Sequence, residues 1–338
     1  MPSSIIAEPT LPLAVALGDP AGVGPEIAAK AWQARREHDL PPFFVVGDMR
    51  SIEAVWSGPI ARLYDPARAI ETFADALPLI QVEDAGAIVP GQPNLPGARC
   101  SLDSLEMAVG LTRGGAASGL VTGPVSKAQL YGIGFVHPGQ TEFVAERCGV
   151  SRDNVVMMLA GPTLRTVPIT THVPLKDVPG LISIDLIVSK ARTTERGLVR
   201  DFGIAKPRLA IAGFNPHAGE NGALGREEID FILPAIERLR EEGIELLGPL
   251  AADTMFHPRA RAQYDAALCL YHDQALIPLK TLHFDEGVNM TLGLPIVRTS
   301  PDHGTAFDIA GQNRADPGAT IAAIRLAGQC AEHRARAA

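Results

Sequence analysis

The chain has 338 residues, of which 46% are hydrophobic and 20% charged, and it carries a net charge of −8. This balance is typical of a globular enzyme. A net-negative protein is not drawn to nucleic acid or to an anionic membrane surface, so neither is expected as its main partner, whereas a small anionic substrate needs only a few local cations. The length is too great for one typical core and favours two joined α/β lobes.

The four cysteines, Cys100, Cys148, Cys269 and Cys330, lie far apart and form no CxxC pair. Buried free thiols in a reducing cytosol are therefore expected rather than a disulfide framework or a zinc ribbon. No basic segment precedes the apolar run Leu11–Leu17, and that run is too short to span a bilayer. We expect a cytoplasmic protein with no export signal or membrane anchor.

Short apolar runs alternate with amphipathic stretches, as in chains built from βα units. Strands are predicted at residues 13–17, 43–46, 120–122, 155–159, 164–168, 209–213, 266–271 and 296–299. Helices are predicted at residues 25–36, 104–113, 141–148, 184–200, 227–242 and 317–333. Residues 50–88 have weaker periodicity and several breakers, so their elements are left unassigned. The alternation predicts an α/β fold with two α/β/α lobes and mostly parallel sheets.

We expect one lobe from residues 1–135 plus 300–338 and a second lobe from residues 136–299. A two-lobed chain usually binds its ligand in the interlobe cleft, beyond the carboxyl ends of the strands. Every polar motif described below follows a predicted strand or lies in the loop after one. The active site is therefore expected in that cleft.

Three histidines stand just past predicted strands: His172 in TTHVPLKD, His217 in GFNPHAGENG and His272 in LYHDQALIPLK. Their wide separation in the sequence suits ligands that the fold brings together rather than a zinc finger. Three neutral imidazoles bind a borderline metal such as Zn²⁺ and leave a position open for substrate. Any one of them alone would more often be an ordinary core or capping histidine. Taken together, they favour a metal site.

Two carboxylates lie close to this set in the sequence. Asp273 directly follows His272, and Asp253 lies in GPLAADTMFH. Either could orient a histidine through its second ring nitrogen or act as the catalytic base. Asp253 could equally cap the stretch that follows it.

Candidate phosphate contacts follow the last of these histidines: Lys280, Asn289 and Arg298. A lysine point charge, a planar arginine fork and an amide donor can together hold a phosphate, although both cations could instead be solvated surface residues. Upstream, Gln140 and Thr141 stand at the start of a predicted helix. A helix N-terminus with a hydroxyl beside it can bind an anion.

The segment DHGTAFDIAG, residues 302–311, has glycines that allow tight turns, and Asp308 in it could accept hydrogen bonds from ribose hydroxyls. No Rossmann GxGxxG follows a strand, because the glycines of the N-terminal GDPAGVGPE have the wrong spacing and context. Local chemistry alone therefore supports a nucleotide cofactor only weakly.

Two stretches resemble the isocitrate and isopropylmalate dehydrogenase family. GDPAGVGPEI resembles its opening GDGIGPE segment, and HGTAFDIAG resembles its adenosine-binding HGSAPDIAG loop. In that family this loop, rather than a Rossmann motif, holds NAD. The resemblance implies the same kind of two-lobed fold, and a nucleotide bound in lobe one by His303, Gly304, Thr305, Ala306 and Asp308.

A fuller resemblance, from Val15 to Ala327, is to the 4-hydroxythreonine-4-phosphate dehydrogenase family. Eight blocks occur in order at compatible spacings: TGPVSK, TTHVPLKD, GFNPHAGENG, EEID, GPLAADTMF, YHDQ, GVNMTLGLP and RTSPDHGTA. The resemblance implies an NAD- or NADP-dependent oxidation of 4-phosphooxy-L-threonine at C3, in pyridoxal 5′-phosphate biosynthesis. The oxidised product then loses CO₂ to give 3-amino-2-oxopropyl phosphate.

The same resemblance implies site residues and a partner. A divalent metal, Zn²⁺ or else Mg²⁺ or Co²⁺, is expected on the three histidines. A homodimer is expected, with an active site shared between subunits and with lobe two carrying the metal, substrate and dimer contacts. The implied substrate contacts are Thr141, Lys280, Asn289 and Arg298.

One position departs from the family pattern. Where the family often has His-Thr in a GHTEF segment, this chain has Gln140-Thr141, and a glutamine cannot become a cation. Relatives of the same fold act on D-threonate or D-erythronate phosphates, or on a cyclohexadiene dicarboxylate diol. Gln140 therefore leaves the substrate more open than the reaction.

Two other classes of function could use the same residues. A two-metal phosphatase needs several carboxylates to bridge ions about 3.5–4 Å apart, and only Asp253 and Asp273 are candidates. A metal- or ligand-binding regulator would need a module through which to act, and no DNA-binding module is evident. The dehydrogenase is favoured over both.

Overall fold

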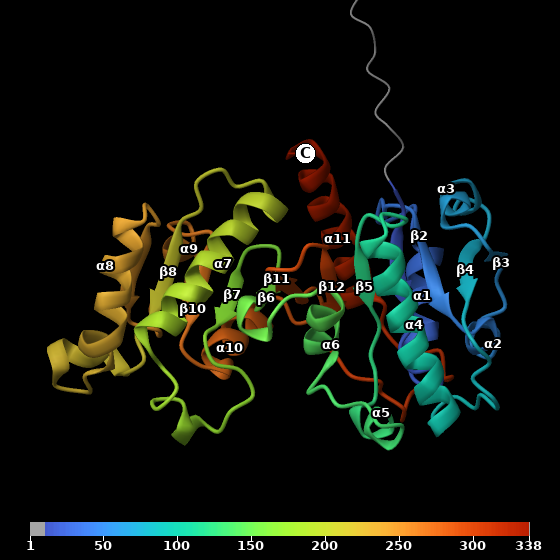
Figure 1. The fold of residues 1–338 in the computed structure, drawn as a ribbon, viewed down its shortest axis with the longest axis horizontal. Coiled ribbons are helices and arrows are strands. Elements are labelled where there is room, and N and C mark those ends of the chain that lie inside the picture. The colour runs from blue at the N-terminus through green and yellow to red at the C-terminus, as the bar shows by residue number, and fades with distance from the viewer. Residues whose placement is uncertain (1–10, 338) are drawn as a thin grey trace, which may run out of the picture. The chain divides into compact units, whose positions relative to one another are not determined.

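The computed structural model describes residues 11–337 and contains two compact units (Figure 1). The first unit comprises the described residues up to Cys148 together with Pro295–Arg336, and the second comprises Gly149–Leu294. The expectation about a basic segment in residues 1–10 lies outside the described part of the chain. Within residues 11–337, no helix combines the length and the apolar character needed to cross a membrane.

The boundaries between the units differ from those predicted. Residues 136–148 and 295–299 belong to the first unit and not to the second lobe. The reason is strand pairing: β12, which begins at Arg298, pairs in parallel with β5 of the first unit's sheet. The Arg298 side chain also donates a hydrogen bond to Thr141, within the reassigned segment.

The sheet of the first unit is parallel throughout, in the order β3-β4-β2-β1-β5-β12. Every residue of β1 and β2 is buried, which explains why these strands are continuous apolar runs rather than alternating ones. The bounds are β1 Leu13–Ala16, β2 Phe43–Gly47, β3 Ile60–Leu63, β4 Leu77–Gln81, β5 Leu120–Thr122 and β12 Arg298–Pro301.

Among the helices of the first unit, α1 begins at Gly24 and has Pro25 in its first turn, where the missing N–H costs nothing. Helix α4 begins earlier than predicted because the Asn94 side chain caps it by accepting a hydrogen bond from the Gly97 N–H. The bounds are α1 Gly24–Gln33, α2 Met49–Glu53, η1 Pro66–Arg68, α3 Ala69–Thr72, α4 Leu95–Arg113, α5 Lys127–Gly132, α6 Gln140–Arg147 and α11 Gly318–Ala337.

The sheet of the second unit has the order β11-β6-β7-β10-β8-β9. The strands β7, β10, β8 and β9 run parallel, whereas β6 is antiparallel to both of its neighbours. The predicted α/β class with mostly parallel sheets is thus confirmed, with β6 as the exception. The bounds are β6 Val156–Ala160, β7 Arg165–Pro168, β8 Leu209–Ala212, β9 Leu246–Leu250, β10 Ala266–Cys269 and β11 Val288–Leu292.

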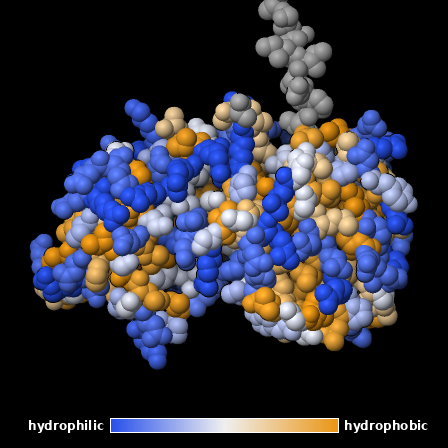
Figure 2. All heavy atoms as spheres, viewed as in Figure 1, coloured by the Kyte–Doolittle hydropathy of each residue, from blue (hydrophilic) through white to orange (hydrophobic). Residues whose placement is uncertain are grey.

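Helices α7 and α8 pack side by side in the second unit (Figure 1), and mainly hydrophilic residues cover α8 on the face shown in Figure 2. The single helix predicted at residues 227–242 is divided into a π-helical turn, η5, followed by α8. The bounds are η2 Arg152–Asn154, η3 Leu175–Asp177, α7 Ile184–Phe202, η4 Pro216–Gly222, η5 Glu228–Ile232, α8 Leu233–Glu241, α9 Pro258–Arg261 and α10 His272–Leu282.

The cysteines agree with the prediction. All four are free; Cys148 is half-buried, and the other three are buried. Burial raises the pKa of Cys100 to about 12, so this thiol stays protonated and unreactive near neutral pH.

Candidate active site

The three candidate metal ligands follow three adjacent strands of the second unit. Strands β7, β10 and β8 are neighbours and run parallel, and His172, His272 and His217 come after them in that order. Because the carboxyl ends of parallel strands meet at one edge of a sheet, all three histidines lie beyond the same edge. The loop after β7, which carries His172, projects hydrophilic residues at its tip (Figure 2).

Two of these rings lie against each other. The ring centroids of His172 and His272 are 5.3 Å apart, a separation that lets both rings reach a shared ion at Zn–N distances of about 2.0–2.1 Å. The Nδ1 atom of His272 lies 2.8 Å from Asp273 Oδ1. A carboxylate on Nδ1 fixes the ring and its tautomer and leaves Nε2 as the ligand atom.

No group of three or more His, Cys, Asp or Glu side chains in metal-binding geometry occurs within residues 11–337. The structure therefore brings together two of the three predicted ligands, with His217 on the neighbouring strand end. The donors still fit the chemistry of a divalent ion, since they are imidazoles and one of them is oriented by a carboxylate. The predicted site stays a prediction that this arrangement favours.

The remaining candidates of the second unit differ in burial. Asp253 is exposed in the turn after β9. Lys280 is half-buried on α10, with its ammonium 5.9 Å from the Phe284 ring centroid. Asn289 lies on β11, and its side-chain oxygen is buried without a hydrogen-bond partner in the described structure. Since a buried polar atom without a partner is costly, the Asn289 amide is suited to meeting a ligand.

Arg298 of the first unit is a buried cation, only 3% exposed. Its guanidinium donates to the hydroxyl of Thr122 at 2.7 Å and to that of Thr141 at 3.4 Å. Burial lowers its pKa to about 10, with a small opposing effect of the Glu142 charge. The solvated-surface alternative is therefore excluded for Arg298. A buried guanidinium held by neutral hydroxyls favours an anion as its ligand.

The glutamine that departs from the family pattern also contacts the backbone of the first unit. Its side-chain amide donates to the Gly123 carbonyl oxygen at 3.1 Å, and it is the first residue of α6, followed by Thr141. One amide proton of Gln140 is thus already used. The residue therefore supports the helix start at which the Thr141 hydroxyl is presented.

The predicted nucleotide loop lies in the first unit and packs on the N-terminal GDPAGVGPE segment. The backbone N–H of Val23 donates to the Thr305 carbonyl at 3.0 Å, and buried Glu26 accepts from the Ala315 N–H at 3.0 Å. The ammonium of Lys30 bridges Glu26 and the Ala315 carbonyl at 2.8 and 2.7 Å. The two motifs that resemble the isocitrate dehydrogenase family are therefore parts of one substructure.

The residues expected to bind the nucleotide are presented at the surface of this loop. Ala306 has a left-handed backbone with φ of 42°, and the ring of His303 contacts the Gly304 carbonyl at 2.9 Å. Asp308 is exposed and therefore accessible to a ligand.

Comparison with known proteins identifies the family. The family model described as "Pyridoxal phosphate biosynthetic protein PdxA" matches residues 40–327. The chain belongs to the PdxA family. It is 58% identical over 323 residues to the 4-hydroxythreonine-4-phosphate dehydrogenase of Zymomonas mobilis, covering 96% of both chains. It is 55% identical over 337 residues to the protein of that name from Erythrobacter litoralis, covering 98% of this chain and 100% of the relative.

A solved structure agrees. The crystal structure of 4-hydroxythreonine-4-phosphate dehydrogenase from Klebsiella pneumoniae superimposes with a TM-score of 0.84 at 33% identity, over 95% of this chain and 98% of that one. The family inferred from the eight blocks is thus confirmed. As a PdxA protein, the chain is an oxidoreductase, a dehydrogenase of pyridoxal phosphate biosynthesis.

The PdxA chain also holds a left-handed turn around His217 that its sequence did not reveal. Residues 217–221 all have positive φ, from 44° to 76°, and four of the five are not glycine. Left-handed backbone costs roughly 1–2 kcal/mol at each non-glycine residue. Such strain persists only where the surroundings fix it, and it is concentrated at functional sites. His172 also has a left-handed φ, of 51°.

Glu228 fixes this turn. It is 3% exposed, and its carboxylate accepts hydrogen bonds from the backbone N–H and the side-chain amide of Asn215, at 2.8 and 3.0 Å. The same amide donates to Glu227 at 2.7 Å and lowers the pKa of that carboxyl. The sequence marked EEID only as one of the eight blocks that resemble the family, and did not predict the buried role of Glu228, because charged residues at the start of a helix are usually solvated.

Gly219→Ala should therefore destabilise the protein strongly. A Cβ at Gly219 would lie 2.5 Å from Glu228 Oε2, which Asn215 holds in place, on a backbone with φ of 76°. Gly243→Ala is the matched control, since Gly243 has φ of 80° and open space around its Cβ position. We expect a loss of roughly 1–2 kcal/mol for the control from φ alone. Gly219→Ala should lose at least about 1 kcal/mol more in urea unfolding. Equal losses would contradict this packing.

Proposed function

We propose that this protein oxidises 4-phosphooxy-L-threonine at C3, with NAD⁺ or NADP⁺ as hydride acceptor. The product, 2-amino-3-oxo-4-phosphooxybutanoate, loses CO₂ to give 3-amino-2-oxopropyl phosphate. The observation that carries the proposal is the alignment of His172, His272 and His217 beyond three adjacent parallel strands. Relatives that match almost the whole chain are named 4-hydroxythreonine-4-phosphate dehydrogenase, and this name supports the proposed substrate.

His172, His217 and His272 would hold a divalent metal, most simply Zn²⁺, with Mg²⁺ or Co²⁺ as alternatives. When bound, this ion supplies Lewis-acid chemistry: it lowers the pKa of a hydroxyl and withdraws electrons from a carbonyl. Asp273 orients the ring of His272 through Nδ1. Because Asp273 already contacts His272, we propose Asp253, which is exposed, as the base. It would take the C3 hydroxyl proton directly or through a water.

Arg298, with the hydroxyl of Thr141 beside it, would bind the substrate phosphate, since a buried guanidinium offers a planar fork of donors. Lys280 and Asn289 of the second unit, and Gln140 at the start of α6, complete the proposed substrate contacts. These groups place C3 for hydride transfer, and positioning is the main contribution of a protein to cofactor chemistry.

The nucleotide would be held by the loop that packs on α1, through His303, Gly304, Thr305, Ala306 and Asp308. Support comes from the hydrogen bond between the Val23 N–H and the Thr305 carbonyl within this loop, and from the one between Glu26 and the Ala315 N–H just after it. A fixed loop reduces the conformational entropy lost on binding. When bound, NAD would supply the hydride acceptor for C3, and the proposed base, Asp253, would take the hydroxyl proton.

We further propose a homodimer in which the active site is shared between subunits. His172 and His272 of one chain lie together, so the partner's contribution is best sought at His217. Inactive His217→Asn and His272→Ala proteins, mixed and refolded together, should then recover part of the activity. Sedimentation of a fully active monomer would contradict this assembly.

A nicotinamide assay tests the proposed function. Absorbance of reduced nicotinamide should rise when the metal-loaded protein receives NAD⁺ and 4-phosphooxy-L-threonine, and it should stop after chelation. D-threonate 4-phosphate and D-erythronate 4-phosphate are the alternative substrates to compare, because Gln140 leaves the substrate open. Release of inorganic phosphate without nicotinamide reduction would favour a phosphatase instead. Binding without any turnover would favour a regulator.

A further inference from the structure

Two buried polar side chains lie beneath the strand-end histidines of the second unit. Thr170, two residues before His172, is 5% exposed, and Gln274, two residues after His272, is 7% exposed. The histidines themselves are exposed or half-buried. Buried polar groups are costly unless they are hydrogen-bonded, so the partners of Thr170 and Gln274 indicate what the two side chains do.

Both side chains bind the backbone of Leu270, one at its carbonyl and the other at its N–H. The hydroxyl of Thr170 donates to the Leu270 carbonyl at 2.8 Å. The Gln274 side-chain oxygen accepts from the Leu270 N–H at 2.7 Å, and its amide donates to the Gly213 carbonyl at 2.8 Å. Thr170, Leu270 and Gly213 come just after β7, β10 and β8 respectively. We call this chain of hydrogen bonds the Leu270 clamp.

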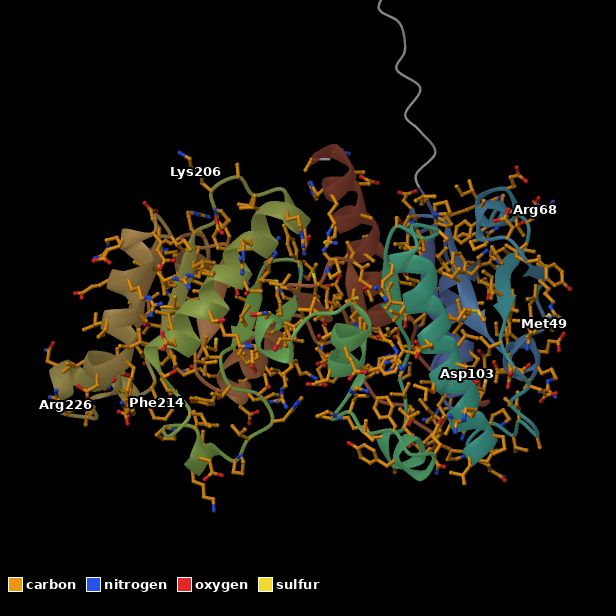
Figure 3. The ribbon with its side chains drawn as sticks, in the orientation of Figure 1. Met49, Arg68, Asp103, Lys206, Phe214 and Arg226 are labelled. Carbon is orange, nitrogen blue, oxygen red and sulfur yellow. The ribbon has the colours of Figure 1, made fainter. Side chains whose placement is uncertain are left out.

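The clamp links the three loops that carry the histidines. Part of it is local, since Gln274, the third residue of α10, reaches back to the N–H of Leu270, the residue before the N-cap Tyr271. The bond from Gln274 to Gly213 is not local: it spans 61 residues of sequence. The ring of Phe214, labelled in Figure 3, also lies edge-on to Tyr271 with centroids 6.2 Å apart.

The strained backbone at two of the histidines explains why a link between the loops would be needed. His172 and His217 both hold left-handed backbone, which tends to relax unless packing and hydrogen bonds oppose it. Thr170 lies two residues from the first of these, and Gly213 begins the loop that contains the second. A metal site needs its ligands held within a few tenths of an ångström. The clamp fixes the three loops at their bases.

We propose that Thr170 and Gln274 are positioning residues of the active site, which hold the strand-end loops of His172, His217 and His272 in place through the Leu270 clamp, including where one of these histidines serves the site of the partner subunit. This inference rests on the metal site proposed above. Neither side chain would touch the metal or the substrate. Their loss should therefore weaken metal binding without removing any ligand.

The variants Thr170→Val and Gln274→Met keep the side-chain volume and remove the hydrogen bonds. Metal-free protein is titrated with Co²⁺, and the visible absorption of the bound ion is followed. Replacing groups behind metal ligands typically costs 10–100-fold in affinity, so the dissociation constant should rise about tenfold or more in each variant. Thr170→Ser retains the hydroxyl and should restore binding to near that of the parent. With metal in excess, kcat should fall more than KM changes.

Two controls separate positioning from general loss of stability. Thr112→Val removes a hydroxyl bond of the same length, 2.8 Å, from a threonine that is also 5% exposed but lies in the first unit. Thr166→Val makes the same change on β7, where the hydroxyl is buried without a hydrogen-bond partner in the described structure. Both should bind Co²⁺ as the parent does, whatever their melting temperatures.

The outcomes distinguish the two proposals. If the parent gives a Co²⁺ spectrum that His272→Ala abolishes, the metal site stands. Unchanged affinity in Thr170→Val and Gln274→Met would then overturn the clamp alone, as would an equal loss in Thr112→Val. If the parent's spectrum does not depend on His272, the metal site is wrong and the inference falls with it.

Discussion

His217→Asn is expected to abolish metal-dependent turnover while leaving the protein folded. Asparagine tolerates the left-handed region better than most residues, so the turn at φ of 52° is retained, but its amide is a poor substitute for an imidazole ligand. We expect kcat/KM to fall by at least about 1,000-fold, which corresponds to roughly 4 kcal/mol of transition-state stabilisation.

The measurement pairs steady-state kinetics with a Co²⁺ titration and a thermal midpoint. His257→Asn is the control, since it makes the same replacement in the same unit at an exposed histidine with an ordinary backbone conformation. It should leave turnover unchanged. Retained activity in His217→Asn would remove that residue from the proposed ligand set.

Arg298→Met should yield a protein that is at least as stable as the parent but close to inactive. Burial lowers the pKa of Arg298 to about 10, so folding disfavours the charged guanidinium. That cost is present throughout the range below pH 10, neutral pH included, and it is relieved only as the pH rises through 10. Replacing a buried charge with an apolar side chain of similar volume is often neutral or stabilising.

The loss of the guanidinium fork should at the same time lower kcat/KM at least about 100-fold. Thermal unfolding with inorganic phosphate connects the two effects. Phosphate should raise the midpoint of the parent, because it binds only the folded protein, and should leave that of Arg298→Met unchanged. A variant midpoint lowered by more than about 5 °C would show that the cation stabilises the fold.

The strands that carry the candidate metal ligands were predicted from the sequence. Hydrophobic runs mark β7, β8 and β10, and because parallel strands end at one edge of a sheet, the sequence predicts that His172, His217 and His272 follow the same edge. The hydrophobic runs do not predict the order of the strands in the sheet. Nothing in the sequence says that β10 lies between β7 and β8, since that depends on long-range packing.

Other elements were missed for identifiable reasons. Strands β3 and β4 lie in the weakly periodic segment, and β9 contains a Gly248-Pro249 pair that normally argues against a strand. Helix α10 starts at His272 and includes Pro278, so its apolar residues were not recognised as helical. The clamp depends on that helix, because only a helical turn brings Gln274 back to Leu270. Conformational strain at His217 is likewise invisible to periodicity.

The first unit is discontinuous in the chain: residues 295–336 complete a body that residues 11–148 begin. During synthesis the second unit, one continuous segment, is made before β12 and α11 and leaves the ribosome ahead of them, and domains generally fold as units. Until then the early part of the first unit has no β12 beside β5 and no loop to cover the N-terminus of α1. The strand ends that carry the histidines are thus complete before the proposed nucleotide and phosphate contacts, which need residues 295–336.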